Sequence, residues 1–152
     1  FTYYLYSCSS VVEIPQNIAD LEDKLPETID YNTHVKPLLS DRCFKCHGPD
    51  KNKVEGNLQL TSSETAYSKG KSGKVAIVPG DAEESEVIKR ILSTDPDEMM
   101  PTPKSHLSLS DEDKAVLIKW IRQGAEYKEH WAFEAPKKPD VPKIGTFFSR
   151  LG

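Results

Sequence analysis

The pentapeptide Cys43-Phe44-Lys45-Cys46-His47 constrains the fold of this chain more than any other sequence feature. The pattern C-x-x-C-H is typical of covalent haem attachment. Two thiols about one helical turn apart lie on one face, so that each can add to a vinyl group of a haem. The histidine that follows the second cysteine is then placed under the iron as its proximal ligand. The motif predicts one haem c, held by Cys43 and Cys46 and ligated by His47.

Three other uses of the cysteine pair are less consistent with the sequence. A zinc site needs four ligands, and besides the isolated Cys8 only His34, His106 and His130 remain, each singly placed. A thioredoxin-like redox pair needs a βαβ context, which the sequence does not suggest. A disulfide across C-x-x-C would close a very short loop and stabilise little. Haem attachment is therefore the favoured interpretation.

Apolar spacing predicts three main helices separated by long irregular loops. The first begins near Tyr31, runs into the haem motif and stops at Gly48-Pro49. The second is capped by Asp81, and the third starts at the capping signal of Ser110 and ends near Gly124. We expect an all-α, cytochrome c-like fold with these helices around one haem. The apolar positions expected on the helices are Val35, Leu38, Leu39, Val87, Ile88, Ile91, Leu92, Leu117, Trp120 and Ile121.

The second axial ligand is expected in the proline-rich loop between the second and third helices. A methionine sulfur is a soft ligand that raises the potential of a small electron carrier. The chain has two methionines, Met99 and Met100. We favour Met100, which precedes Pro101 and is therefore biased towards an extended backbone. Met99, His106 and an open distal site are the alternatives, and the second ring nitrogen of His47 should donate to a backbone carbonyl, near Pro49 or in the 70–80 loop.

We expect residues 30–130 to form the cytochrome domain and the two ends of the chain to lie outside it. Residues 1–29 are interpreted as a signal remnant and tether, and Leu5-Tyr6-Ser7-Cys8 resembles a lipobox, which makes Cys8 a candidate for lipidation. Residues 131–152 form a proline-rich extension or linker. No stretch reaches the roughly 18 apolar residues needed to span a bilayer.

The overall charge is acidic, with a net charge of -4 and a pI of about 5.6. This balance argues against nucleic acid as a partner, because such binding needs a basic stripe. The negative charge predicts salt-sensitive docking with basic redox partners.

Several motifs, taken in order, resemble the planctomycete-type cytochrome c domain over roughly residues 30–135. They are the segment 30–39, the motif Cys43–Asp50, the segments 77–81 and 84–86, the loop 95–101 and the closing helix 118–125. The resemblance implies a mostly helical module with one haem c, in which Cys43 and Cys46 match the thioether cysteines, His47 the proximal ligand and Met100 the distal methionine. It also implies haem attachment outside the cytoplasmic membrane, and further domains beyond the proline-rich tail.

The expected function is one-electron transfer by a periplasmic or otherwise extracytoplasmic carrier, lipid-anchored if Cys8 is modified. We expect no enzymatic activity and no substrate pocket of the protein's own, with redox proteins of the cell envelope as partners. One alternative is a haem enzyme or gas sensor with an open distal site. Another is a structural or interaction module of a larger secreted protein.

Overall fold

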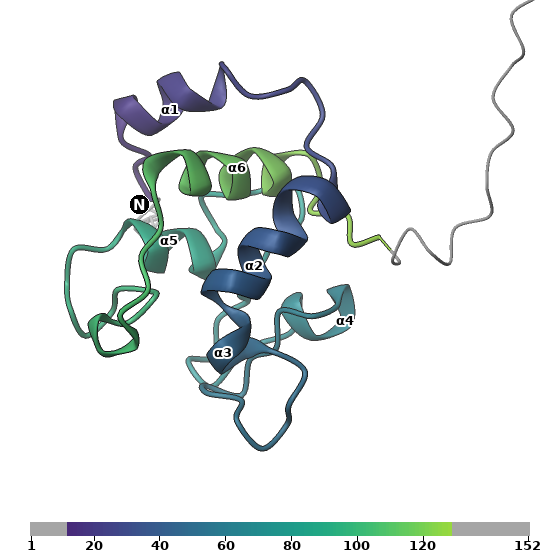
Figure 1. Cartoon of the computed structure of the whole chain (residues 1–152), viewed down its shortest axis with the longest axis vertical. Helices are drawn as coiled ribbons and strands as arrows, with labels where there is room; N and C mark the ends of the chain where they lie inside the picture. The colour runs from purple at the N-terminus through teal and green to yellow at the C-terminus, as the bar shows by residue number, and fades with distance from the viewer. Residues whose placement is uncertain (1–11, 129–152) are drawn as a thin grey trace, which may run out of the picture.

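The computed structural model describes residues 12–128, and within this range the chain is helical (Figure 1). The described residues contain no β-strand, only two isolated bridges, Lys69 to Val75 and Val78 to Asp81. The prediction of an all-α fold is confirmed for this part of the chain. Its elements are α1 (Gln16–Glu22), η1 (Tyr31–Val35), α2 (Lys36–Arg42), α3 (Phe44–His47), α4 (Ser63–Ala66), α5 (Glu86–Leu92), η2 (Pro103–Ser105) and α6 (Asp111–Arg122).

Helix α6 is the longest element and packs against α1, α5 and η1 (Figure 1). Its start is the predicted capping box, in which the Ser110 hydroxyl accepts from the Asp113 N–H at 3.1 Å and the Asp113 carboxylate accepts from the Ser110 N–H at 3.0 Å. Gly124 follows its end with a φ of +102°, a conformation that glycine adopts without strain. The buried face of α6 consists of Ala115, Leu117, Ile118, Trp120 and Ile121.

Part of the segment 1–29, interpreted from the sequence as a signal remnant and tether, is helical and packs on the rest of the domain. Helix α1 lies along α6 and buries Ile18 in the common core. Polar contacts fasten it: Arg122 Nη1 donates to Glu22 Oε2 at 2.6 Å, and Asn17 donates to Asp111 at 2.8 Å. A seven-residue helix with one fully buried side chain has little periodicity of its own, because its stability comes from the helix it packs on.

The second predicted helix begins later than expected. Asp81 does not cap α5; its carboxylate accepts from the Glu84 N–H at 3.0 Å and forms a local turn. The N-cap position is Ser85, which is fully buried. The Ser85 hydroxyl donates to the Asp81 carbonyl at 2.7 Å and accepts from the Val78 N–H at 2.9 Å. The expected apolar positions Ile88 and Ile91 are buried in the core.

The first predicted helix is divided into η1, α2 and α3. Asp30 caps η1 by accepting from the Thr33 N–H at 2.9 Å. Cys43, with φ −120° and ψ −36°, interrupts the helix between α2 and α3. The helical run ends at Gly48, as predicted, where a Cβ atom would collide with the backbone of Phe44.

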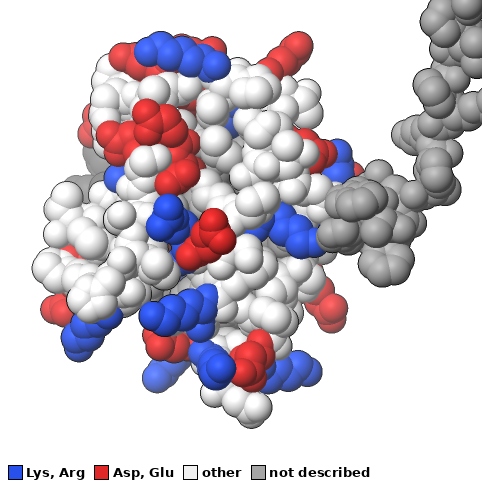
Figure 2. Space-filling model, in the orientation of Figure 1, with Lys and Arg blue, Asp and Glu red and all other residues white. Residues whose placement is uncertain are grey.

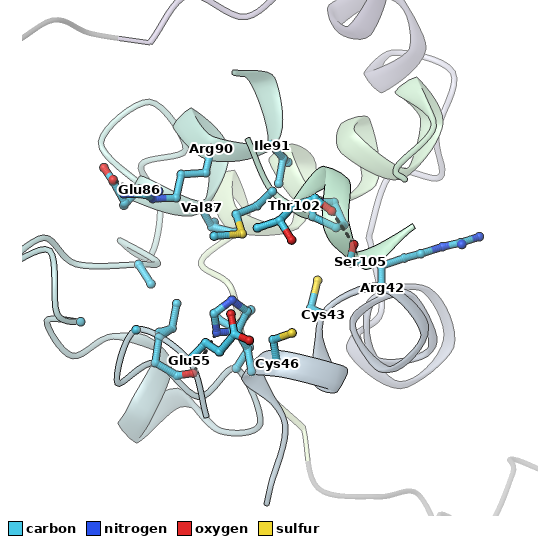
Figure 3. A pocket seen from close by; sticks show the side chains of 18 of the residues that line it. Arg42, Cys43, Cys46, Glu55, Glu86, Val87, Arg90, Ile91, Thr102 and Ser105 are labelled. Carbon is cyan, nitrogen blue, oxygen red and sulfur yellow. Dashed lines mark hydrogen bonds and ion pairs between the residues drawn. The ribbon is translucent and has the colours of Figure 1, made fainter. Parts of the chain in front are cut away.

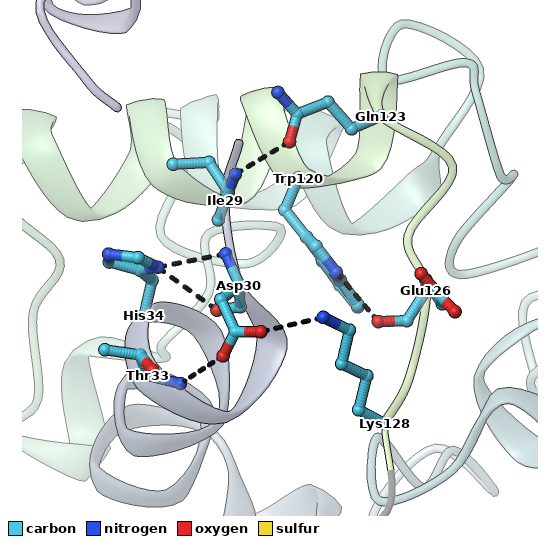
Figure 4. Close-up of polar contacts among 8 residues, drawn as sticks. All are labelled: Ile29, Asp30, Thr33, His34, Trp120, Gln123, Glu126 and Lys128. Atoms are coloured by element: carbon cyan, nitrogen blue, oxygen red, sulfur yellow. Dashed lines mark hydrogen bonds and ion pairs between the residues drawn. The ribbon is translucent and has the colours of Figure 1, made fainter. Parts of the chain in front are cut away.

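Contacts across the fold join the start of η1 to the end of α6 (Figure 4). The Ile29 N–H donates to Gln123 Oε1 at 2.9 Å, and Trp120 Nε1 donates to the Glu126 carbonyl at 3.3 Å. Lys128 Nζ lies 2.8 Å from Asp30 Oδ2. These contacts hold the segment before the haem motif against the closing helix, and so position α2 and α3. Among residues 12–128, no helix combines the length and apolar character needed to cross a bilayer.

Candidate haem site

A cavity of about 330 Å³ lies between α3, α5 and the loops around residues 55–60, 70–76 and 100–109 (Figure 3). Its volume is at the lower end of the range of about 300–1,000 Å³ typical of ligand sites. Much of the wall is apolar, which suits a large apolar ligand. The apolar side chains on the wall include Leu58, Leu60, Ala76, Val87, Ile91, Leu107 and Leu109.

The two cysteines of the motif lie on one wall of this cavity. Figure 3 shows Cys43 and Cys46 across from Val87, Ile91 and Thr102. The Cys46 N–H donates to the Cys43 carbonyl at 3.2 Å, so the helical turn sets the spacing of the two side chains. The two thiols are not bonded to each other.

The surroundings of both thiols raise their pKa above the ordinary value. Burial raises the pKa of the Cys43 thiol to about 12. Burial, and then the nearby Glu55 carboxylate, raise the pKa of the Cys46 thiol. A redox-active C-x-x-C pair needs a lowered thiol pKa, so the electrostatics of this site do not favour a thioredoxin-like role.

His47 is oriented by a backbone carbonyl, as the sequence predicts. Its Nδ1 lies 3.1 Å from the Leu58 carbonyl oxygen. Because a carbonyl can only accept, Nδ1 carries the proton, and the lone pair of Nε2 remains for a metal. The carbonyl belongs neither to the surroundings of Pro49 nor to the 70–80 loop. The Leu60 N–H, which donates to the His47 carbonyl at 2.9 Å, holds the same loop against α3.

Met100 lines the cavity and packs against the hydrophobic core. Its N–H donates to the Arg90 carbonyl at 3.0 Å, which ties the loop to α5. Met99 and His106, the other two candidates for the distal ligand, are not among the lining residues, and His106 is exposed. The structure therefore brings Cys43, Cys46, His47 and Met100 to one cavity.

Charged side chains around the cavity are a part of the site that the sequence analysis did not identify. Glu86 lies 3.0 Å from Arg90 Nε and 3.4 Å from Lys74 Nζ. The spacing of four between Glu86 and Arg90 on a predicted helix could have indicated their pairing. Nothing local in the sequence connects Lys74 to them. The charged residues on the cavity wall are Arg42, Lys45, Glu55, Lys71, Lys74, Glu86 and Arg90.

The zinc alternative finds no structural support within residues 12–128. These residues contain no group of three or more His, Cys, Asp or Glu side chains placed to hold a metal ion. His34 instead interacts through Nδ1 with the backbone of Asp30, 3.0 Å from its nitrogen and 3.3 Å from its oxygen. Cys8 and His130 lie outside the described residues, as do the candidate lipobox and the proline-rich extension.

A helical domain in which the two cysteines and the histidine of C-x-x-C-H line one largely apolar cavity has the character of a c-type cytochrome. Comparison with protein families agrees: residues 43–104 match the family described as Planctomycete cytochrome C. The match confirms the resemblance to a planctomycete-type cytochrome c domain, a family whose name is consistent with haem binding. It runs from the first cysteine of the motif to just beyond Met100. Neither the curated proteins nor the solved structures that were compared with the chain include a match.

Proposed function

We propose that this protein holds a single haem covalently through Cys43 and Cys46, ligates its iron with His47 and Met100, and transfers one electron at a time. The observation that carries this proposal is that all four residues line the same cavity. Met100 follows His47 by more than fifty residues in the sequence, so their presence at one cavity results from the fold and supports a common ligand.

The residues present suit such a group. The largely apolar wall would accommodate a porphyrin, and Cys43 and Cys46, both on that wall, would hold it through thioether bonds. The protonated Nδ1 of His47 gives its Nε2 the lone pair that an iron ligand requires. A haem bound here supplies reversible exchange of one electron between Fe(II) and Fe(III).

The chain's own part is to hold the iron in one coordination state. The Leu58 carbonyl fixes the ring plane of His47 and makes the imidazole a stronger donor. The soft thioether of Met100 favours Fe(II) over Fe(III) and raises the potential. With His47 and Met100 both holding the iron, a bound haem would have no position left for a substrate, which favours a carrier over an enzyme.

The compartment and the partners follow from the attachment chemistry of c-type cytochromes. Haem is attached to such domains outside the cytoplasmic membrane, which makes the protein periplasmic or otherwise extracytoplasmic. Its partners are redox proteins of the cell envelope. A lipid on Cys8 would anchor it to a membrane, and residues 131–152 would lead into a larger multidomain protein.

The attachment is tested by expressing the protein together with a c-type haem maturation system. Under denaturing conditions the wild-type polypeptide should retain one haem, measured by mass and by haem staining. The double substitution Cys43→Ala and Cys46→Ala should abolish this retention, because no thioether can form. The matched control is Cys8→Ala, which should keep the haem. Retention of haem by the double variant would refute the attachment.

Axial ligation is tested with carbon monoxide. The reduced wild-type protein should not bind carbon monoxide rapidly, since Met100 occupies the sixth position. Rapid binding would instead support the haem enzyme or gas sensor. A protein that takes up haem and cycles its redox state, yet exchanges no electrons with any envelope partner, would support the structural module.

A further inference from the structure

The chain continues to interact with the domain after the end of α6. Ala125 is fully buried, and its N–H donates to the Trp120 carbonyl at 2.9 Å. Three residues later, Lys128 Nζ lies 2.8 Å from Oδ2 of Asp30, the residue that caps η1 (Figure 4). We call residues 124–128 the strap. One end of the strap is fixed to α6 and the other to the start of η1.

Tyr127 occupies the middle of an aromatic cluster that the strap completes. The centroid of its ring lies 4.8 Å from that of Tyr31, 5.2 Å from that of Trp120 and 6.0 Å from that of Tyr67. These separations are typical of interacting aromatic pairs. The side chain also packs against the hydrophobic core. The position of the Tyr127 hydroxyl is therefore fixed by contacts of its ring with several elements.

This hydroxyl connects the strap to the loop that orients the histidine of the haem motif. The Tyr127 hydroxyl donates to the Leu60 carbonyl at 3.3 Å. The Leu60 N–H donates in turn to the His47 carbonyl at 2.9 Å. Two residues earlier in the same loop, the Leu58 carbonyl accepts from His47 Nδ1 at 3.1 Å. The strap, the loop and the histidine are thus joined by consecutive hydrogen bonds.

We propose that Tyr127 is a positioning residue for the proximal ligand, and that it acts on His47 through the segment Leu58–Leu60. This inference rests on the proposed function, since the orientation of His47 affects an iron only if His47 binds it. Tyr127 lies outside residues 43–104, which match the cytochrome family. The proposal therefore extends the haem site to a part of the chain beyond both the C-x-x-C-H motif and the Met100 loop.

The physical effect on the iron follows from the hydrogen bond at Nδ1. A firmly held acceptor at Nδ1 makes the imidazole a stronger donor to a metal, which favours Fe(III) and lowers the reduction potential. Without the Tyr127 hydroxyl, the segment Leu58–Leu60 loses one of its attachments. The Leu58 carbonyl should then be held less firmly against His47, and the potential should rise.

Tyr127→Phe is the test variant, because it removes the hydroxyl and keeps the ring in the aromatic cluster. The substitution changes no charge. Any change in potential is therefore independent of the charged side chains, which Figure 2 shows in both signs on the surface. Tyr67→Phe is the matched control. It removes a hydroxyl from the same cluster, but the hydrogen bond that it breaks, at 2.6 Å, goes to the Ala125 carbonyl of the strap and not to the segment Leu58–Leu60.

Hydrogen exchange measured by NMR on the reduced, haem-loaded protein reports how firmly the loop is held. The quantity compared is the exchange rate of the Leu60 amide divided by that of the Ile118 amide, which lies in the core of α6. A general loss of stability accelerates both rates and leaves the ratio unchanged. Tyr127→Phe should raise the ratio roughly three- to tenfold, the loss expected for one hydrogen bond. Tyr67→Phe should change it less than twofold.

The histidine itself provides the readouts that a purely structural role would not affect. Tyr127→Phe should move the His47 Nδ1–H proton signal to lower chemical shift and should raise the reduction potential. Tyr67→Phe should leave both unchanged. Equal effects of the two variants, or an unchanged His47 signal in Tyr127→Phe, would overturn the proposal.

The wild-type preparation separates the two levels of inference. Absence of covalent haem, or a haem whose iron is not bound by His47, would refute the proposed function and with it the role of Tyr127. A wild-type spectrum typical of histidine ligation, together with the same potential in Tyr127→Phe as in wild type, would refute only the positioning role.

Discussion

Replacing Met100 by alanine should convert the proposed six-coordinate haem site into one with an open sixth position. The substitution removes the sulfur that faces the cavity and leaves α5 and its hydrogen bond from the Met100 N–H in place, because that bond involves only backbone atoms. The ferric protein should lose the charge-transfer band that a methionine sulfur gives. The reduced protein should bind carbon monoxide within the mixing time.

The structure also sets the expected cost in stability. Complete burial of a methionine side chain contributes roughly 1.5–3 kcal/mol, and Met100 is partly buried against the core. Truncation should therefore lower the free energy of unfolding of the haem-free protein by about 1 kcal/mol. The haem-loaded protein should lose more than this, because the sulfur–iron bond is lost as well. Urea unfolding of both forms measures the difference.

Met99→Ala is the matched control, since it removes the same atoms one residue away. Met99 contributes neither to the cavity wall nor to the hydrophobic cluster. Its loss should change stability by no more than about 0.5 kcal/mol and should leave the band and the response to carbon monoxide unchanged. If Met99→Ala abolished the band and Met100→Ala kept it, the ligand assignment would be reversed. Unchanged spectra in both variants would exclude methionine ligation.

Two further predictions concern the elements that position the site. The hydrogen bond and charge of Lys128 lower the pKa of Asp30 to about 2, so the stability that this carboxylate contributes is present above about pH 4 and lost as the pH falls towards 2. Asp30→Asn should lower the free energy of unfolding near neutral pH by about 0.5 kcal/mol. The effect is small because the side chains of Asp30 and Lys128 remain 35% and 38% exposed, so that solvent screens the ion pair. A difference between variant and wild type that persists at pH 2 would contradict the ion pair as its cause. Ser110→Ala should cost about 1 kcal/mol by removing the cap of α6, measured by urea unfolding against the exposed Ser108→Ala, and equal stabilities of the two variants would count against the capping box.

The sequence alone was sufficient to predict local structure wherever the interacting groups are neighbours along the chain. The spacing of Cys43, Cys46 and His47 is complete within one helical turn, so the haem motif and its place on a helix could be predicted. The capping box spans four residues, Ser110 to Asp113, and the turn at Gly124 that follows α6 depends on that residue's own backbone freedom. Local geometry determines each of these features.

Turns that resemble helix caps were the first point at which local reasoning failed. Asp81 has the composition of an N-cap, but its carboxylate completes a separate turn, and α5 starts five residues later. The position at which α5 starts depends on Ser85, whose buried hydroxyl forms hydrogen bonds with the backbone of Asp81 and of Val78. A pattern of residue types does not distinguish a cap from such a turn.

By itself, then, the sequence indicated a C-x-x-C-H motif at a helical turn and a helical fold, which the structure shows over residues 12–128, because those signals act within a few residues. Only the tertiary structure decided that α1 packs on α6, that the Leu58 carbonyl orients His47, and that Met100 and not Met99 lines the cavity. Each of these depends on groups brought together from distant parts of the chain. Their energies come from packing and hydrogen bonds that exist only once the chain has folded.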